Sequence, residues 1–521
     1  MSIRLSLFVV VPLALALSAC PTKSDPLSCL DGCSHQDELT FCDIDGVFPA
    51  SELANECISP PPDACNRVEP CLGADKTMCT DDSMGVCVEC MTGRDCDTGE
   101  ICDDVGACVA FTCDFGNAGN AACSAVDSSL PYCGDGDVCV GCLDSMNCSV
   151  AVGEICDDTA QQCRGCEANP ECPSKLCGIG DGVCADAADL LYVADGGSGA
   201  DCTQLDPCGS ITDAIGKVTV ALDTIIVGPG TYDDHVSVTT KTVTIVADGD
   251  VTVNPALTAV SGEQNVLAVT GTGNVTADGI KIVPASGTVG TDAIDCDAGG
   301  TLTLLRSEVS NSVDVGVLAD NCTLTITGST ISENSGIGVN STNGSLTITG
   351  STISGNGGGI TSTNSDYQIE NNFSVQNSSS AVGGIAISGD GTNLTKIVNF
   401  NTFVENTRTD PGYAIACTAS SLVATNNIFL HVDNGTNTAF VSGSTCTTTY
   451  SLFDLDVVLP AGVGNVKDDA IFVNLAGGDF HLETGSPGIN AADPDATLAT
   501  DIDGDMRPLG GRHDMGADEA E

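Results

Sequence analysis

The second half of the sequence predicts an all-β solenoid, in which the chain coils through short parallel strands. A block that begins at Leu324 returns nearly unchanged at Leu346, 22 residues later, and a weaker copy begins one period earlier at Leu302. A fixed period of this size is typical of solenoids. The alternation Leu-Thr-Ile-Thr inside each block, with Gly, Asn and Ser at the breaks, indicates β-strands and turns rather than helices.

The period also predicts which side chains stack. Side chains alternate between the two faces of a strand and neighbouring strands lie about 4.8 Å apart, so residues one period apart should lie directly above one another. At Ile360 the apolar position arrives one residue early, which predicts a bulge or a one-residue adjustment. At this period the region would hold about ten to twelve coils. Three columns should point inward and a fourth outward: Leu302, Leu324 and Leu346; Leu304, Ile326 and Ile348; Val309, Ile331 and Ile353; and, outward, Thr303, Thr325 and Thr347.

The residues before the repeats predict a cap for the first coil. Ser210 is expected to cap a short helix whose apolar face carries Ile211, Ile215 and Val218. A strand over residues 224–227 should follow. Such a helix would cover the open edge of the first coil, which could otherwise pair with another chain.

This stretch resembles the opening of pectin-lyase-type proteins, in which a strand, a capping helix and a Gly-Thr-Tyr turn lead into the first coil. Here the strand is Leu190–Val193 and the turn is Gly230–Tyr232. The resemblance covers residues 190–253, and the repeats extend it to about Val441. It implies a right-handed, single-stranded parallel β-helix over residues 189–453. Most well-known proteins of this kind act on polysaccharides, which makes such an enzyme one candidate.

The composition is strongly acidic. The chain has 71 Asp and Glu against 16 Lys and Arg, a formal net charge of -55, and no Trp. Such a surface repels nucleic acids and anionic lipid headgroups, so no nucleic-acid partner is expected. The charge alone favours a solvated acidic surface over a dedicated ion-binding site.

The N-terminal residues predict export and a lipid anchor. Arg4 precedes a short apolar run over residues 5–17, too short to span a bilayer, and a small-residue cleavage site ends the signal peptide at residues 1–19. The four residues Leu-Ser-Ala-Cys that end at Cys20 resemble the bacterial lipobox. The resemblance implies acylation of Cys20, and Pro21 after it implies the outer membrane or cell surface. The alternative is an ordinary cleavage site followed by a disulfide cysteine.

The cysteines point to disulfides. The chain has 31 cysteines; without Cys20, 24 lie between Cys29 and Cys184 and six lie beyond. Even numbers in both parts, behind an export signal, predict disulfides outside the reducing cytoplasm. The connectivity of the first 24 stays open. The last six form three local pairs: Cys202 with Cys208, Cys296 with Cys322, and Cys417 with Cys446.

The first half of the chain divides into a tether over residues 20–70 and cysteine-rich repeats over residues 71–188. Modules that begin at Cys87 and Cys139 share the spacing C-x2-C-x5-C and then a Cys-Asp-Asp run. Large apolar residues are few, so bridges must replace a core. The C-x2-C pairs also match zinc spacing, but oxidising export favours disulfides. The modules resemble cysteine-rich repeats of secreted myxobacterial lipoproteins, which implies spacing or display.

Residues 454–521 resemble a closing domain of bacterial surface proteins called choice-of-anchor Q, which follows parallel β-helices. The family pattern is SPxIxxG, then D-x-D-G-x-x-R-P, then D-[IV]-G-A-x-E. This chain departs from it at Ala492, where Gly is usual, and at Met515, where Ile or Val is usual. The matching segments are Phe480–Leu482, Gly485–Asn490, Thr500–Pro508 and Asp514–Glu519.

One motif in this segment is a candidate calcium site. Asp501, Asp503 and Asp505 place carboxylates at alternate positions, as in a loop that wraps Ca²⁺. The bidentate Glu of an EF-hand is missing, since Arg512 stands in its place. The alternative, which this favours, is a turn in which Asp side chains accept backbone N–H groups and Arg507 pairs with a carboxylate. Calcium is the one cofactor that the sequence suggests.

No catalytic residue is assigned from the sequence. A β-elimination needs a base, usually Arg or Lys, and a cation that acidifies the sugar. No such base stands beside a carboxylate cluster in the sequence, and Arg408 and Asp410 are the best candidates. His235, His431 and His481 have no nucleophile elbow nearby. The Asn pairs at 371–372 and 426–427 should form turn ladders. The bases of the coil region are Lys217, Lys241, Lys281, Arg306, Lys396 and Arg408.

The sequence therefore favours a cell-surface lipoprotein with a non-catalytic role in adhesion, glycan binding or structural display. Its expected partners are the membrane, through Cys20, and glycans or surface proteins. The alternative is a calcium-dependent polysaccharide lyase or glycoside hydrolase. A carboxylate cluster near an Arg on one outer face would favour the enzyme, and a smooth Ser/Thr/Asn face would favour binding.

Overall fold

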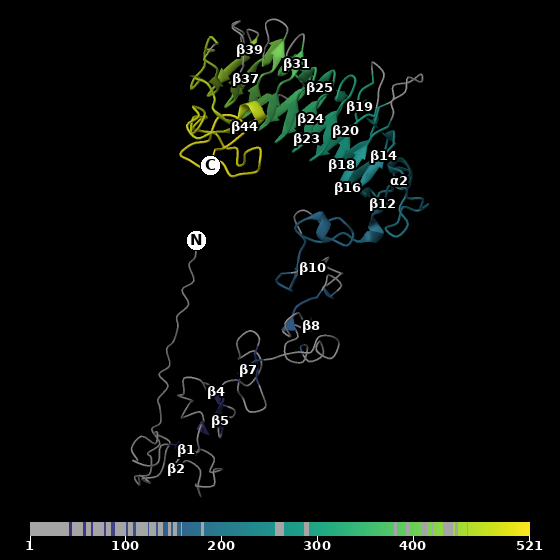
Figure 1. Ribbon diagram of the computed structural model, residues 1–521, viewed down its shortest axis with the longest axis vertical. Helices are drawn as coiled ribbons and strands as arrows, with labels where there is room; N and C mark the ends of the chain where they lie inside the picture. Colours follow the sequence, from purple (N-terminus) through teal and green to yellow (C-terminus); the bar gives the residue numbers. More distant parts are fainter. Residues whose placement is uncertain are drawn as a thin grey trace, which may run out of the picture. The chain divides into compact units, whose positions relative to one another are not determined.

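The computed structural model describes two compact units, residues 1–150 with 155–164 and residues 151–154 with 165–521 (Figure 1). The described residues are 154–157, 159–178, 182–255, 265–285, 291–379, 383–391, 396–408, 414–418, 420–430, 441–442, 446–455 and 457–520, with short segments before residue 150. Cys20 and the expected signal peptide lie outside them.

The first unit contains short antiparallel β pairs. Each described strand has two to four residues, too few to bury a core. The pairs are β1 (Phe41–Asp43) with β2 (Glu56–Ile58), β3 (Ala64–Cys65) and β4 (Met78–Cys79) with β5 (Gly85–Val88), β6 (Glu100–Cys102) with β7 (Cys108–Ala110), β8 (Tyr132–Cys133) with β9 (Cys139–Val140), and β10 (Ile155–Cys156) with β11 (Cys163–Arg164).

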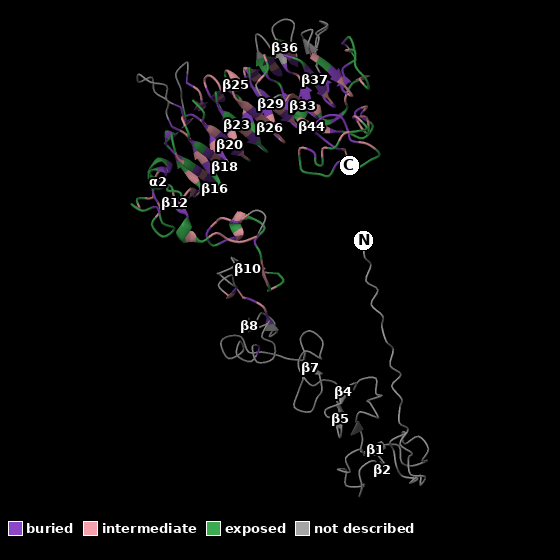
Figure 2. Cartoon of the chain, turned by 180° about the vertical axis from the view of Figure 1, so that it is seen from behind, coloured by how far each residue is buried: buried purple, intermediate pink, exposed green. Residues whose placement is uncertain are grey.

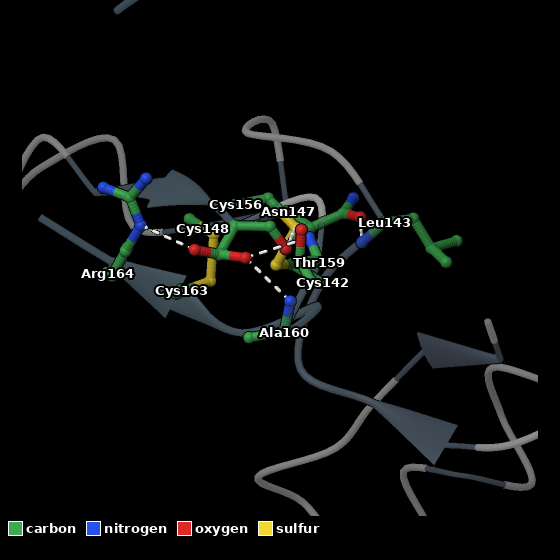
Figure 3. Close-up of a disulfide and its surroundings, with 10 residues drawn as sticks. Cys142, Leu143, Asn147, Cys148, Cys156, Thr159, Ala160, Cys163 and Arg164 are labelled. Carbon is green, nitrogen blue, oxygen red and sulfur yellow. Dashed lines mark hydrogen bonds and ion pairs between the residues drawn. A yellow bond between two sulfur atoms is a disulfide. The ribbon is translucent and has the colours of Figure 1, made fainter. Parts of the chain in front are cut away.

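In the described part of this unit, disulfides join the strands and turns of the module around β10 and β11 (Figure 3). Cysteines that match zinc spacing, such as Cys142, are bonded to other cysteines. The structure also joins each of the three pairs expected beyond residue 184. The described bridges are Cys142–Cys156, Cys148–Cys163, Cys166–Cys177, Cys172–Cys184, Cys202–Cys208, Cys296–Cys322 and Cys417–Cys446.

Asp157 stabilises the turn between β10 and β11. Its Oδ1 accepts hydrogen bonds from the N–H groups of Thr159 and Ala160, and its Oδ2 lies 2.9 Å from Nε of Arg164 (Figure 3). These bonds, led by the one from Ala160, lower the pKa of Asp157. The geometry is that of a turn-forming Asp.

The second unit is a parallel β-helix with two long sheets (Figure 1). In the described part, the coils contribute one strand each to a nine-stranded sheet: β15 (Val236–Val238), β17 (Leu267–Val269), β19 (Ile294–Asp297), β22 (Val317–Asp320), β25 (Ile337–Thr342), β28 (Gly358–Thr363), β32 (Ile385–Ser388), β36 (Ile415–Thr418) and β39 (Val441–Ser442).

The second sheet of the β-helix has twenty strands and supplies most of the candidate site. Its members are β12 (Leu191–Val193), β13 (Thr224–Val227), β14 (Gly230–Tyr232), β16 (Thr242–Val253), β18 (Asn274–Ile282), β20 (Thr301–Leu305), β21 (Glu308–Ser310), β23 (Thr323–Thr327), β24 (Thr330–Ser332), β26 (Ser345–Thr349), β27 (Thr352–Ser354), β29 (Asp366–Glu370), β30 (Phe373–Val375), β33 (Lys396–Asn399), β34 (Thr402–Val404), β37 (Leu422–Thr425), β38 (Ile428–Leu430), β40 (Cys446–Thr449), β41 (Leu452–Phe453) and β42 (Val466–Lys467).

The predicted columns are confirmed in the register. Leu304 pairs with Ile326, and Ile326 with Ile348, and all three side chains are fully buried. Thr325, the neighbour of Ile326, faces outward and is partly exposed. Figure 2 shows the same alternation of buried and exposed positions along the strands. Stacking of like residues therefore sets the register of the middle coils.

The coil length varies more than the repeats suggested, so the expectation of ten to twelve coils was too high. Val236 pairs with Leu267, 31 positions later, and Ile385 pairs with Ile415, 30 positions later. Extra residues between strands lengthen these coils without disturbing the pairing. Val339 pairs with Ile360, 21 positions later, which is the expected one-residue adjustment.

Buried asparagines join the coils at their turns. Asn334, Asn356, Asn377 and Asn406 form a ladder in which each amide Nδ2 donates to Oδ1 of the next, at 2.9–3.0 Å. At most 5% of the surface of each is exposed. The ladder satisfies polar groups that burial would otherwise leave unpaired.

A helix closes the first coil, as the sequence predicted. In α2 (Ile211–Lys217), Oγ of Ser210 accepts a hydrogen bond from the N–H of Asp213, and Ile211 and Ile215 are buried against the coil interior. Two 3-10 turns precede β12, at Asn169–Glu171 and Ala187–Asp189.

The C-terminal segment packs on the outer face of the last coils. In early coils the outward positions are polar, as in Thr330–Ser332, but in later coils they become apolar, as in Phe373–Val375 and Ile428–Leu430. These side chains share an apolar cluster with Phe480 of β44 (Asp479–Leu482) and with Met515. β44 pairs with β43 (Phe472–Asn474), and a 3-10 turn at Leu475–Gly477 joins them.

Arg507 lies buried at this junction. Its Nη1 donates to the carbonyl of Asp514 at 3.1 Å and lies 3.5 Å from Glu519, and its Nη2 donates to the carbonyl of Gly516 at 2.9 Å. The guanidinium also lies 4.8 Å from the centre of the Phe400 ring. Burial lowers the pKa of Arg507, and the carboxylate of Glu519 acts in the opposite direction.

The columns predict contrasting effects of two neighbouring substitutions. Ile326→Asp would bury a carboxylate with no partner and should lower the free energy of unfolding by more than about 4 kcal/mol. Thr325→Asp places the charge in water and should change it by less than about 0.5 kcal/mol. Denaturant unfolding measures both; equal effects would contradict the column assignment.

Asp514 should make stability depend on pH. Burial raises its pKa to about 6 from 3.8, so between these values the folded protein binds more protons than the unfolded chain. The contribution of Asp514 to stability should therefore fall as pH rises from about 4 to about 6, by about 3 kcal/mol in total. Asp514→Asn should remove this slope in denaturant unfolding, whereas Asp505→Asn should keep it. A slope unchanged by Asp514→Asn would contradict the assignment.

Candidate functional site

A groove of about 540 Å³ lies between the outer face of the late coils and the C-terminal segment. Strands β29, β33 and β37 form its floor, and residues 493–499 form its wall. The floor combines polar side chains with Ile397 and Val423, of which Val423 is 55% exposed. A concave surface with a few oriented polar groups beside apolar ones is typical of small-ligand sites.

A directed chain of side-chain amides crosses this floor. The N–H of Asp493 donates to Oδ1 of Asn426 at 2.7 Å, and Nδ2 of Asn426 donates to Oδ1 of Asn399 at 3.0 Å. Nδ2 of Asn399 then donates to Oε1 of Glu370 at 3.1 Å. Each amide is held by hydrogen bonds to both neighbours. A ligand that binds in the groove would therefore lose little conformational entropy in ordering these side chains.

Lys396 is the basic residue among those that line the groove. Its Nζ lies 2.6 Å from Oδ2 of Asp390, whose Oδ1 accepts a hydrogen bond from Ser420. The hydrogen bond from Lys396, followed by the one from Ser420, lowers the pKa of Asp390. Lys396 is thus engaged in an ion pair with Asp390 and is not free to act as the base that β-elimination needs.

A second feature of the C-terminal segment surrounds His481. Its Nδ1 lies 2.6 Å from Asp479 and its Nε2 lies 2.7 Å from Asp503. Burial lowers the pKa of His481, but the hydrogen bonds to Asp479 and Asp503 outweigh it, so the net shift is upward. Oδ2 of Asp518 accepts the N–H of Leu482 at 2.6 Å, and burial raises the pKa of Asp518.

The three acidic residues predicted to hold calcium make different contacts in the structure. Oδ1 of Asp501 accepts the N–H groups of Asp503 and Asp505, and its Oδ2 accepts the N–H of Glu519 at 3.2 Å. Together with the pairing of Arg507 with Glu519, this is the arrangement of the turn alternative. Asp503 faces His481, and Asp505 is exposed.

Several of the other candidate residues cannot be placed. The side chain of Arg408 and all of Asp410 and His431 lie outside the described residues. Several bases pair with carboxylates of the preceding coil, among them Lys281 with Asp250 at 2.7 Å and Arg306 with Asp278. The expected ladders hold Asn372 and Asn427, but Asn371 and Asn426 face the C-terminal segment.

Sequence reasoning missed both the groove wall and the His481 cluster. The wall residues 493–499 carry no motif. His481 and Asp503 belong to different motifs 22 positions apart, and only the packing of β44 on the following turns brings them together.

The described part of the chain contains no helix long and apolar enough to span a membrane.

Comparison with known proteins agrees with this architecture. Residues 265–452 match the family described as "Right handed beta helix region". Among solved structures, the crystal structure of pectate lyase Pel9A is similar, with 15% sequence identity and a TM-score of 0.42, over 64% of this chain and 96% of that chain. No curated protein matches the sequence. The family match describes the coils as a right-handed parallel β-helix.

Proposed function

We propose that this protein is an exported, non-catalytic glycan-binding protein, tethered to the outer membrane or cell surface by a lipid on Cys20. The disulfides in both units support export, because such bonds persist outside the reducing cytoplasm. The lipid anchor rests on the lipobox resemblance of the residues that end at Cys20.

The amide chain across the groove carries the assignment to glycans. Sugar hydroxyls both donate and accept hydrogen bonds, and the oriented groups of Asn399 and Glu370, which Asn426 helps to hold, offer both functions. Val423 and Ile397 provide apolar area beside them for the C–H faces of a sugar ring. A volume of about 540 Å³ suits a short stretch of a glycan chain.

The charges favour a neutral glycan over a polyuronate. Glu370, Asp493 and Asp495 line the groove, and the single lining base, Lys396, is neutralised by Asp390. The net charge of the chain, -55, adds a repulsive field for acidic polymers. An unprotonated base beside a cation site, which a lyase would need, is not supported by this arrangement.

The groove is tested by one substitution on its floor. Asn399→Ala interrupts the amide chain and should weaken binding of a neutral glycan, selected on a glycan array, by about tenfold or more. Titration calorimetry measures the affinity. Thr325→Ala, on an outward position of an early coil, is the matched control and should bind like the wild type. Equal affinity of Asn399→Ala and wild type, or turnover of a polysaccharide by the wild type, would contradict the proposal.

The anchor is tested separately by mass. Cys20→Ser should abolish acylation and leave the chain unprocessed or soluble, because the modified thiol is lost. Mass spectrometry of the N-terminal peptide and fractionation of cells measure the outcome. A mature wild-type protein without lipid, with Cys20 in a disulfide, would refute the anchor and leave the groove assignment intact.

A further inference from the structure

We propose that His481, Asp503 and Asp518 form a binding site for a divalent transition-metal ion of the Zn²⁺ class. The site lies in the C-terminal segment and is independent of the proposed glycan binding. Each residue offers one ligand atom, and these atoms lie within 4.8 Å of one another. Among the described residues, the other groups of this kind consist of disulfide-bonded cysteines.

The imidazole of His481 is already oriented as a metal ligand. Metal-binding histidines almost always donate one ring N–H to a carboxylate, a backbone carbonyl or a water, which directs the other nitrogen at the ion. Here Nδ1 lies 2.6 Å from Asp479, and Nε2 points at Asp503, 2.7 Å away. A bound ion would lie between the Nε2 lone pair of His481 and Asp503, with any proton on Nε2 released to solvent and the Nδ1 N–H donated to Asp479.

Asp518 adds a carboxylate that is poorly compensated by its surroundings. Only 6% of its surface is exposed, and its one described hydrogen bond is the N–H of Leu482 on Oδ2. A buried carboxylate with so few donors favours a nearby cation. The side chains of His481 and Asp503 are 39% and 52% exposed, which gives an ion access from solvent and leaves positions for water.

The donor set selects the class of ion. One imidazole nitrogen and two carboxylate oxygens suit Zn²⁺ or Mn²⁺, whereas Ca²⁺ and Mg²⁺ prefer oxygen ligands alone. A bound ion would join β44, which carries His481, to the turn at Asp503 and to the last residues at Asp518. We therefore expect it to stabilise the packing of the C-terminal segment.

The test uses the full chain after removal of metals with a chelator. Zn²⁺ is titrated by calorimetry at moderate salt, and the melting temperature is measured with and without Zn²⁺. The wild type should bind one ion and melt at a higher temperature when loaded. Asp518→Asn, which keeps an oxygen to accept the N–H of Leu482, and His481→Gln should each weaken binding at least tenfold and remove the thermal shift. Asp505→Asn, an exposed carboxylate in the same turn, is the control and should bind like the wild type.

The outcomes separate the site from counterion attraction to an acidic protein. Equal binding by wild type, Asp518→Asn and His481→Gln would show only diffuse association and overturn the site. Weaker binding by Asp505→Asn, or tighter binding of Ca²⁺ than of Zn²⁺, would assign the ion to the Asp501–Asp505 loop and also overturn it. If His481→Gln fails to fold, Asp518→Asn still decides the result.

Discussion

Arg507 is a charged side chain with no exposed surface, buried where the C-terminal segment meets the late coils. Burial removes the water around its guanidinium. The carbonyls of Asp514 and Gly516, the carboxylate of Glu519 and the face of the Phe400 ring compensate for that loss. Removing one member of such a buried pair typically costs about 3–5 kcal/mol, because the other charge stays behind. The groove wall precedes Arg507 in the chain and Asp518 follows it, so this contact lies between the two candidate binding features in the sequence.

The interior of the β-helix could be predicted from the sequence because its constraint is local. A residue at Ile326 needs a like residue one period away on each side, and that requirement is written as a repeat. The number of coils could not be predicted as well, because the pairing of Ile385 with Ile415 tolerates extra residues between strands that leave no periodic signal. The helix cap at Ser210 was predictable for the same reason as the columns, since its partner is three residues away.

The candidate site depends on contacts between residues that are far apart in the chain. Such contacts produce no repeat in the sequence, so they are harder to predict than the inward columns. The apolar outward positions at Phe373 and Ile428 are visible in the sequence, but they become informative only when the inward column is known. The pairs Asn371–Asn372 and Asn426–Asn427 show the same point. In each pair, one amide completes an internal ladder and its neighbour faces the C-terminal segment, an alternation that composition alone does not reveal.

The stacked register of the coils makes the length of the β-helix a modular quantity. Leu302, Leu324 and Leu346 occupy equivalent positions, and the strands of these coils pair with those of the coils before and after. If one whole period were inserted or deleted in this region, the coils on either side would still stack through equivalent residues. The late coils, with the apolar outward positions that contact the C-terminal segment, would keep their own sequence. The distance between the capped first coil and the groove can thus be altered in steps of one strand spacing, about 4.8 Å, without rebuilding either end.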